Sequence, residues 1–392
     1  MAPKPPTRLA LVTAFFGVLT ACMDPSLAGS GLVSSNISIA EAPAGVSEIG
    51  LRIRGQDFDP INLTVTPNTE AIILELPVGK NRLFEGRGGT YFARTIAAVT
   101  PKGVNVGLNF SPVLIVPDTD NSRLVQVWRN DDPAWEELTE AELGFTGFFP
   151  SDVDYDGGGR AYFTNDDGTE GGVYRVSSIF DTTETQLSSA GNTTSIAIDR
   201  DRQRVYFVAA GGPALVATNY SGSIEVPLDI GNFTANSRLA IDSQGYLYVT
   251  NGASGIGAGA IQKYDPIAET TVGTPVAIPY GRVEDIHFVG GVLYVVLSGT
   301  DAGQAPIVRL SSNLTFLGSL GTIASDPANA QPGEFYGPTG FVTDRRGRLV
   351  ITDEVTDAFD NTYDRLVFLD PGNPGAWATF GTSGSGEEEF RF

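Results

Sequence analysis

The alternation of apolar and polar residues along most of the chain is that of short β-strands. The clearest stretch runs from Tyr336 to Asp370, where the runs GFVT, RLVIT and RLVFLD are rich in β-branched and aromatic residues. Each run is bounded by Gly, Asp or Asn, the residues that favour turns. Helical periodicity is nearly absent, and the one fair helix candidate is Pro133–Leu143. The pattern predicts an all-β protein.

The same strand pattern recurs at a nearly constant spacing. Aligned on the residue that ends the second strand, the copies fall at Asp118, Asn165, Ala209, Asn251, Leu297 and Asp353. The steps between them are 47, 44, 42, 46 and 56 residues. A period of about 40–50 residues with several strands per unit is typical of a β-propeller. The six copies predict a six-bladed β-propeller over residues 111–392.

Motifs within these units resemble those of the NHL-repeat propellers. The first unit carries PDTDNSRLVQVW, and the last ends in the glycine-rich FGTSGSGEEEF. The last unit also follows the order of the NHL pattern with Pro338, Gly340, Asp344, Gly347, Asp353, Arg365 and Asp370. The third and fifth units depart from it, with Ala209 and Leu297 where Asp or Asn is expected. The resemblance covers about residues 112–392 and implies the fold, but it implies little chemistry because propellers host many functions.

Residues 32–110 show a different strand pattern without this repeat unit. Alternating runs such as EIGLRIRG, AIILELPVG and TYFARTIAAV follow one another at roughly ten-residue spacing. This spacing predicts a small Ig-like β-sandwich domain in front of the propeller. The segment 104–110 could be the last strand of the sandwich or the innermost strand of the first blade.

The first residues have the pattern of a secretory signal. Lys4 and Arg8 precede an apolar run of 11 residues, which is too short to cross a bilayer but suits a signal peptide. The run leads into Leu-Thr-Ala-Cys22, which resembles a bacterial lipobox; the alternative is an ordinary signal peptide. The resemblance implies a lipoprotein signal peptide over residues 1–21, acylation of Cys22 and a flexible tether over residues 22–31. We therefore expect a protein held in a lipid bilayer of the bacterial cell envelope through Cys22.

Composition narrows the range of partners. The formal net charge is −21, and Cys22 is the single cysteine, so no disulfide is expected. An acidic surface repels phosphate backbones, and we expect no nucleic-acid partner. Such an acidic surface attracts cations instead.

The predicted innermost strands place two rows of residues on the side of the central channel. The first row reads Asp152, Ser195, Arg238, Asp285 and Gly340, and the second reads Asp154, Ala197, Ala240, His287 and Val342. We expect the second-strand ends to lie at the same mouth of the channel. The candidate ligand-binding site is therefore Asp118, Asp152, Asp154, Asn165, Arg238, Asn251, Asp285, His287 and Asp353. The turn residues Asp156, Asp199, Asp242 and Asp344 are interpreted as backbone caps at the opposite end.

These residues favour a binding scaffold for a protein, glycan or small ligand, without catalytic residues or a cofactor. Carboxylate and amide oxygens also suit Ca²⁺, and the acidic mouth resembles the metal centre of regucalcin and paraoxonase. His287 with Asp285 or Glu284 resembles the lyase pair of streptogramin lyase. A divalent-metal-dependent hydrolase or lyase is thus the alternative. A third interpretation is that Asp and Asn merely end strands and cap turns. With one histidine in the sequence, a multi-histidine zinc site is excluded.

Overall fold

The computed structural model describes the chain from Leu32 to Phe390 with short gaps. The residues outside the description are 1–31, 42–45, 47, 56, 68, 70, 89–90, 113, 128–135, 157–159, 177–183, 210–214, 224, 229–233, 235, 301–303, 326–330, 332, 344–347, 357–361, 371–372, 384–388 and 391–392. The predicted signal peptide, Cys22 and the tether therefore lie outside the described residues.

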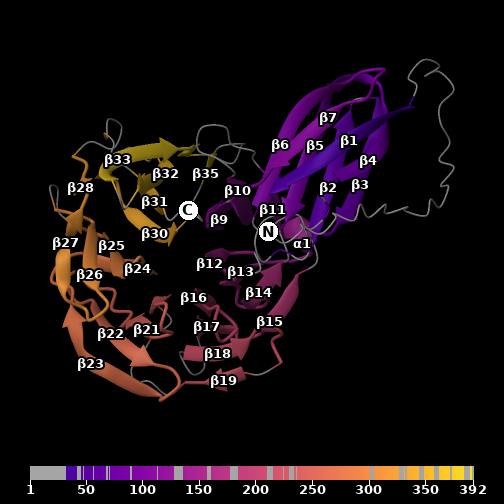
Figure 1. Ribbon diagram of the computed structural model, residues 1–392. Helices are drawn as coiled ribbons and strands as arrows, with labels where there is room; N and C mark the ends of the chain where they lie inside the picture. Colours follow the sequence, from indigo (N-terminus) through magenta and orange to yellow (C-terminus); the bar gives the residue numbers. More distant parts are fainter. Residues whose placement is uncertain are drawn as a thin grey trace, which may run out of the picture.

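Two sheets form the N-terminal part of the molecule (Figure 1). One has the order β4 (Ala71–Pro77), β1 (Leu32–Glu41), β7 (Asn105–Asn109). The other has the order β3 (Phe58–Val65), β2 (Ile49–Gly55), β5 (Gly79–Gly88), β6 (Tyr91–Val99), β8 (Ser111–Pro112). Alternate residues of both sheets, such as Ile37, Leu51 and Phe84, meet in one apolar core. This is the arrangement that the strand alternation predicts.

The end of the sandwich settles the position of residues 104–110. β7 pairs in parallel with β1, and Phe110 packs against the sandwich core. β8 then pairs with β6 before the chain enters the next sheet at Leu114. Segment 104–110 is thus a strand of the sandwich and not the innermost strand of a blade.

Six antiparallel sheets follow one another along the rest of the described chain. The first has three strands, β9 (Leu114–Asp118), β10 (Arg123–Val127) and β11 (Glu136–Thr139). The second and third are β12 (Pro150–Tyr155), β13 (Ala161–Asn165), β14 (Gly172–Val176), β15 (Thr185–Ser188), and β16 (Thr193–Asp199), β17 (Arg204–Ala209), β18 (Leu215–Asn219), β19 (Glu225–Pro227).

The remaining three sheets repeat the four-strand order. They are β20 (Leu239–Ile241), β21 (Leu247–Thr250), β22 (Ala260–Asp265), β23 (Thr270–Ala277); β24 (Arg282–Val289), β25 (Val292–Ser298), β26 (Ile307–Ser311), β27 (Phe316–Leu320); and β30 (Pro338–Thr343), β31 (Leu349–Thr356), β32 (Thr362–Asp370), β33 (Asn373–Phe380). Consecutive strands pair within each sheet because turns of a few residues, such as Gly290-Gly291 at positive φ, join them.

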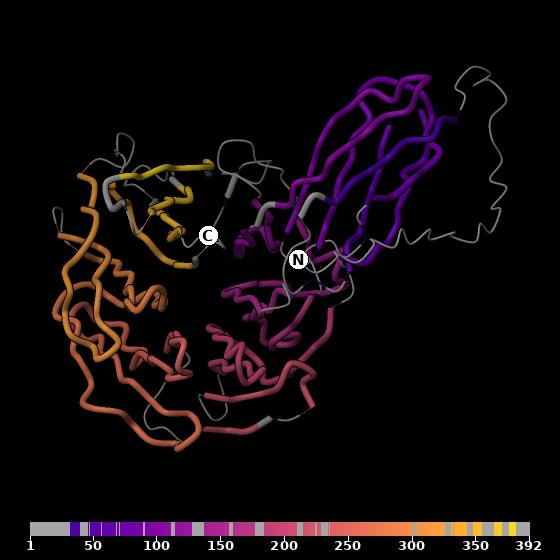
Figure 2. The backbone as a smooth tube through the Cα atoms, in the orientation of Figure 1, coloured from indigo at the N-terminus to yellow at the C-terminus, as the bar shows by residue number. Residues whose placement is uncertain are grey.

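The sheets stand in a ring with their first strands on the inside (Figure 1). We call β12, β16, β20, β24 and β30 the inner strands; each lies beside the next. The first sheet packs against the sixth through Leu114 and Val116, which meet Val350 and Leu366. Figure 2 shows this meeting of the purple and yellow ends of the ring. The ring is therefore closed by apolar contacts between its first and last sheets.

The first sheet corresponds to the second, third and fourth strands of the others. Asp118 at the end of β9 pairs with Arg123 of β10, as Asp353 of β31 pairs with Arg365 of β32. β9 is thus the counterpart of β31, and no described strand pairs with its other edge.

Two smaller features complete the described fold. The short strands β28 (Thr322–Ile323) and β29 (Glu334–Phe335) pair in parallel before β30, and β34 (Thr382–Ser383) and β35 (Glu389–Phe390) repeat that pairing after β33. The helix candidate is a strand end followed by a single α-helical turn, α1 (Glu140–Leu143), which Thr139 and Glu142 close with a capping box. Within the described chain, no helix has the length and apolar character needed to cross a membrane.

Candidate functional site

Two cavities lie along the axis of the ring. The larger, of about 480 Å³, is lined by β12, β16, β20 and β24 and by the turns that follow the last three of these strands. We call it the turn-end cavity. The smaller, of about 250 Å³, is lined by β9, by the starts of the inner strands and by Glu354 of β31. We call it the loop-end cavity. Asp152 and Asp285 line both cavities, so the predicted channel-side row does face the axis.

Channel-side residues of one inner strand bind the backbone of the next. Each inner strand is the edge of its sheet, so its outward N–H groups need other acceptors. Asp152 accepts hydrogen bonds from the Ile196 N–H at 2.8 Å and from the Ser195 hydroxyl at 3.1 Å. Ser195 in turn accepts one from the Leu239 N–H at 3.0 Å. Side chains therefore replace the missing strand-to-strand ladder between sheets.

The belt continues through Arg238 and Asp285. Arg238 cannot accept, and its Nε donates to the Glu284 carbonyl at 2.6 Å while Nη1 donates to the Thr194 carbonyl at 3.3 Å. Asp285 accepts from the Phe341 N–H of β30 at 2.8 Å. We call Asp152, Ser195, Arg238 and Asp285 the inter-strand belt. It joins the five inner strands at the level of the axis.

Where the preceding strand offers no acceptor, an aspartate caps its own neighbour. Ile286 is on the inner strand that comes after Arg238 around the ring, and Arg238 offers it no acceptor. Its N–H therefore donates to Asp285 Oδ1 of its own strand at 2.8 Å. The Val153 N–H, on the side of the first sheet, donates to Asp152 Oδ1 at 2.8 Å. This pattern explains why aspartates stand at these two positions of the repeat.

Burial sets the protonation of the belt carboxyls. It raises the pKa of Asp152 to about 6, against the lowering effect of the Ile196 N–H and the Arg238 charge. Burial and the charge of Asp152 together raise the pKa of Asp285 well above its usual range. Two neighbouring carboxylates resist ionisation because their negative charges repel each other. The positive charge of Arg238 lowers the pKa of both aspartates and so offsets part of this repulsion.

Asp154 and His287 belong to the turn-end cavity, as the second predicted row requires. Asp154 Oδ2 accepts from the Ile198 N–H at 2.9 Å, and Oδ1 lies 3.3 Å from Arg200 Nη2. His287 lies against Phe341, with 5.7 Å between ring centroids. Burial lowers the pKa of His287 to about 4, so the imidazole is neutral at neutral pH. Both oxygens of Asp285 accept hydrogen bonds from backbone N–H groups, those of Ile286 and Phe341.

Comparison with known proteins concerns the fold. No protein-family model and no curated protein matches this sequence. Among solved structures, the chain is similar to one from a nidogen/laminin complex, with a TM-score of 0.50 and 14% identity over 68% of this chain and 92% of that one. The ring is a β-propeller.

Two bacterial structures of unknown function are also similar. One is a structural-genomics protein from Bacteroides thetaiotaomicron VPI-5482, with a TM-score of 0.45 and 12% identity over 84% of this chain and 78% of that one. The other is from Bacteroides caccae, with a TM-score of 0.46 and 13% identity over 66% of this chain and 89% of that one.

The second-strand ends do not join the channel of the propeller, which corrects the predicted site. Asp118, Asn165, Asn251 and Asp353 line neither cavity. Asn165 accepts from the Phe149 N–H and donates to the Gly147 and Glu170 carbonyls, and Asp353 accepts from the Tyr336 and Gly337 N–H groups. Asn251 holds the 251–260 loop in the same way. These side chains turn back into their own blades, because the loops beside them leave buried backbone groups that need partners.

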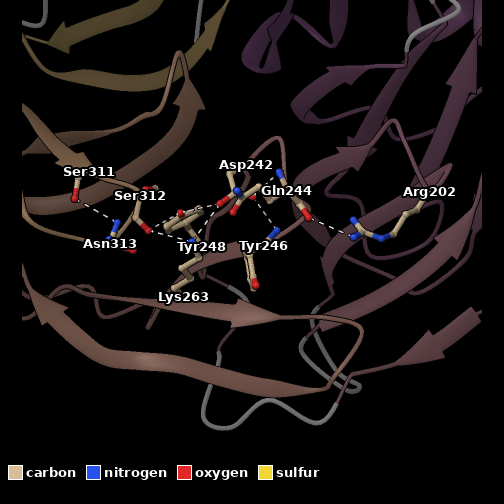
Figure 3. A network of polar contacts seen from close by, with 9 residues as sticks. All are labelled: Arg202, Asp242, Gln244, Tyr246, Tyr248, Lys263, Ser311, Ser312 and Asn313. Carbon is tan, nitrogen blue, oxygen red and sulfur yellow. Dashed lines mark hydrogen bonds and ion pairs between the residues drawn. The ribbon is translucent and has the colours of Figure 1, made fainter.

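The turn aspartates are caps, as predicted, but their end of the channel holds the larger cavity. Asp242 accepts from the N–H groups of Gln244 and Tyr246, from the Tyr248 hydroxyl and from Lys263 Nζ (Figure 3). Lys263 Nζ also donates to the Ser312 carbonyl of the next blade, and the Tyr248 hydroxyl oxygen lies 2.8 Å from the same carbonyl oxygen. Asp156 and Asp199 bind Arg160 and Arg202; Asp344 lies outside the described residues.

Sequence reasoning missed Glu354. It lines the loop-end cavity together with Val350 and Thr352, at the two-residue spacing of one strand face. Burial, and then the charges of Asp364, Asp120 and Glu284, raise its pKa to about 7. The alternation of β31 was visible in the sequence, but a residue of a second strand lines the axis here because no described inner strand lies along β9. Among the described side chains, no group of three or more His, Cys, Asp and Glu is arranged to hold a metal ion.

Proposed function

We propose that this protein is a lipid-anchored bacterial lipoprotein whose six-bladed, NHL-like propeller is a non-catalytic binding scaffold. The ligand is a partner or small molecule that places a cationic group in the turn-end cavity. One observation carries the proposal. This cavity, of about 480 Å³, is lined by Asp152, Asp154, Asp199, Asp201, Asp242 and Asp285, against one cationic side chain, Arg200, and the neutral His287.

The hydrogen bonds of the cavity carboxylates favour a binding scaffold over an enzyme. Asp152 and Asp285 are bound on both oxygens by backbone N–H groups or a hydroxyl, and Asp154 is bound in the same manner. A carboxylate held in this way contributes charge to a cavity, but it is poorly placed to exchange a proton with a substrate. A chain with a similar fold belongs to a nidogen/laminin complex, which is consistent with a propeller used for binding.

Anchoring rests on the lipobox-like sequence at Cys22. The sandwich begins at Leu32 and leads into the propeller through β8 and β9. In the proposed arrangement the sandwich spaces the propeller from the membrane, and the acidic protein surface stays hydrated above an anionic bilayer.

Thermal melting of the full chain tests the ligand class. A bound ligand raises the melting temperature by mass action, so spermidine and arginine ethyl ester are expected to raise it and neutral oligosaccharides are not. Asp201→Asn, at an exposed residue of the cavity rim, should reduce the shift, whereas Asp59→Asn on the exposed surface of the sandwich should not. An equal shift in both variants would refute binding in this cavity. A shift with Ca²⁺ that a chelator reverses would support the metal-dependent alternative instead.

A further inference from the structure

One outer face of the sandwich gathers basic side chains. In the five-stranded sheet, Arg52 of β2 lies opposite Glu85 of β5, and Glu85 lies opposite Arg94 of β6. Residues directly opposite one another point to the same side of a sheet. Their sequence neighbours Leu51 and Phe84 belong to the apolar core, so this row points away from the core.

Two more arginines extend this row along the strands. Arg54 follows Arg52 by two residues in β2, and Arg87 follows Glu85 by two residues in β5, so both point to the same side. We call Arg52, Arg54, Arg87 and Arg94 the arginine face. Residues 32–110 contain seven basic and seven acidic residues. More than half of the basic residues of the sandwich are therefore on this face, whereas Glu85 is the single acidic residue in β2, β5 and β6.

The carboxylate of the face is buried under its partner. Glu85 is 2% exposed and lies 2.9 Å from Arg54 Nη2 in an ion pair, while the Arg54 side chain is 38% exposed. The negative charge is thus held inside the layer of side chains and the positive charge is held at its surface. After this pairing, three arginine charges remain uncompensated on the face.

Two of these charges have no partner in the part of the chain that the structure describes. Arg52 and Arg94 form neither an ion pair nor a hydrogen bond with a described residue, and Arg94 is exposed. Arg87 lies over the ring of Phe92, 5.7 Å from its centroid. Ile96, two residues after Arg94 in β6, is 62% exposed. The face therefore combines accessible guanidinium groups with an exposed apolar side chain.

The sign of the face is opposite to that of the propeller. Residues 111–392 contain 16 basic and 38 acidic residues. A polyanion is repelled by such a propeller but attracted by the arginine face. Guanidinium groups also match the geometry of phosphate oxygens, which they bind with two N–H donors at once.

We infer that the arginine face binds the anionic phosphate headgroups of the lipid bilayer. The choice of partner rests on the proposed anchor. Cys22 precedes Leu32, the first residue of β1, by ten residues, and a chain of that length reaches at most about 35 Å. An acylated Cys22 therefore keeps the sandwich near the headgroups, and Ile96 is placed to enter the boundary between headgroups and acyl chains.

This contact gives the sandwich an orientation on the membrane. The outer side of the five-stranded sheet lies on the headgroups, and the chain leaves the sandwich through β8 toward the propeller. The acidic propeller is repelled by the same headgroups, so the sandwich remains between the bilayer and the propeller.

Vesicle binding of the full chain tests the inference. The probes are phosphatidylcholine vesicles with and without phosphatidylglycerol, and the readout is the ratio of the two affinities, because N-terminal residues and acyl chains are the same in all variants. One basic residue near an anionic surface contributes roughly fivefold to binding. Arg52→Gln/Arg94→Gln should therefore lower the ratio by about tenfold or more.

Two further double variants serve as controls. Arg202→Gln/Arg282→Gln removes the same charge from exposed arginines of the propeller and should leave the ratio unchanged. Arg52→Lys/Arg94→Lys keeps the charge and should keep most of the preference for phosphatidylglycerol, which separates a loss of charge from a loss of fold.

The outcomes also separate this inference from the proposed anchor. Equal ratios for the sandwich and propeller glutamine variants would overturn the inference, whether or not Cys22 is acylated. A lower ratio for Arg52→Gln/Arg94→Gln in a chain that proves not to be acylated would support the face without the anchor. Binding of soluble dextran sulfate through these arginines, without a preference for phosphatidylglycerol, would assign the face to a dissolved polyanion and overturn the bilayer assignment.

Discussion

Among single residues, Glu354 has a carboxyl group whose charge should change near neutral pH. Its pKa in the folded state is raised from 4.5 to about 7. A raised carboxyl pKa means that the folded state binds the proton more tightly than the unfolded state. The contribution to stability is therefore largest below pH 4.5 and is lost as the pH rises through 7. Glu354→Gln should remove this dependence.

We expect Glu354→Gln to be more stable than the parent at pH 8, by about 1–2 kcal/mol after allowing for solvent screening of a half-buried group. At pH 4 the two proteins should be about equally stable, because Glu354 is then mostly protonated in both the folded and the unfolded state. Urea denaturation at both pH values measures the difference, with the exposed Glu75→Gln as control. A constant difference at both pH values would show that the effect does not come from titration of Glu354.

Replacing Asp353 should also have a large effect, but only on the free energy of unfolding. It binds two backbone N–H groups and the buried Arg365 guanidinium. Asp353→Ala leaves that cation buried without its carboxylate, which should lower the free energy of unfolding by about 3–5 kcal/mol. Asp201→Ala at an exposed site should change it by less than about 0.5 kcal/mol. Denaturant unfolding is the measurement, and a loss for Asp353→Ala below about 1 kcal/mol would contradict its role as a loop anchor.

At the scale of strands, the inter-strand belt holds neighbouring blades together without a shared ladder. Ser195 both accepts from the Leu239 N–H and donates to Asp152. Ser195→Ala should therefore destabilise the protein by about 1–3 kcal/mol, because a buried N–H and a buried carboxylate each lose a partner. Ser223→Ala, in an exposed turn, is the matched control. Chemical denaturation that cannot distinguish the two variants would refute the belt as an energetic link.

The strands themselves could be predicted because their signals are local. Alternation, turn residues and the repeat spacing fix where GFVT or RLVIT begins and ends, and they also place Asp152 and Asp285 on the channel side. The direction of a side chain at the end of a strand is not determined by the neighbouring sequence alone. Asp118 and Asp353 were expected in the channel, but the neighbouring loops offer buried N–H groups and an arginine, and these decide their orientation. That no described strand lies along the outer edge of β9 likewise depends on pairing across the whole ring.

For the whole molecule, the proposed anchor predicts where the protein is found in the cell. Acyl chains on Cys22 would hold it in the bilayer, since several chains on one residue bind stably. Cys22→Ser should move the protein from the membrane pellet to the soluble fraction and leave its melting temperature unchanged, because Cys22 precedes the first described strand. Fractionation with immunodetection measures this. A variant that stays in the pellet after a high-salt wash would argue against lipidation.

The parallel pairing of β1 with β7 sets how the sandwich would respond to tension. The chain enters β1 at Leu32 and leaves β7 at Asn109 toward the propeller, and the two strands run side by side in the same direction. Force applied between an anchored N-terminus and a partner held by the propeller would slide these strands past each other. Every hydrogen bond between them would then be loaded at once instead of opening one after another. Such a joint resists pulling far better than a hairpin peeled from its end, which suits a domain placed between a membrane and a load.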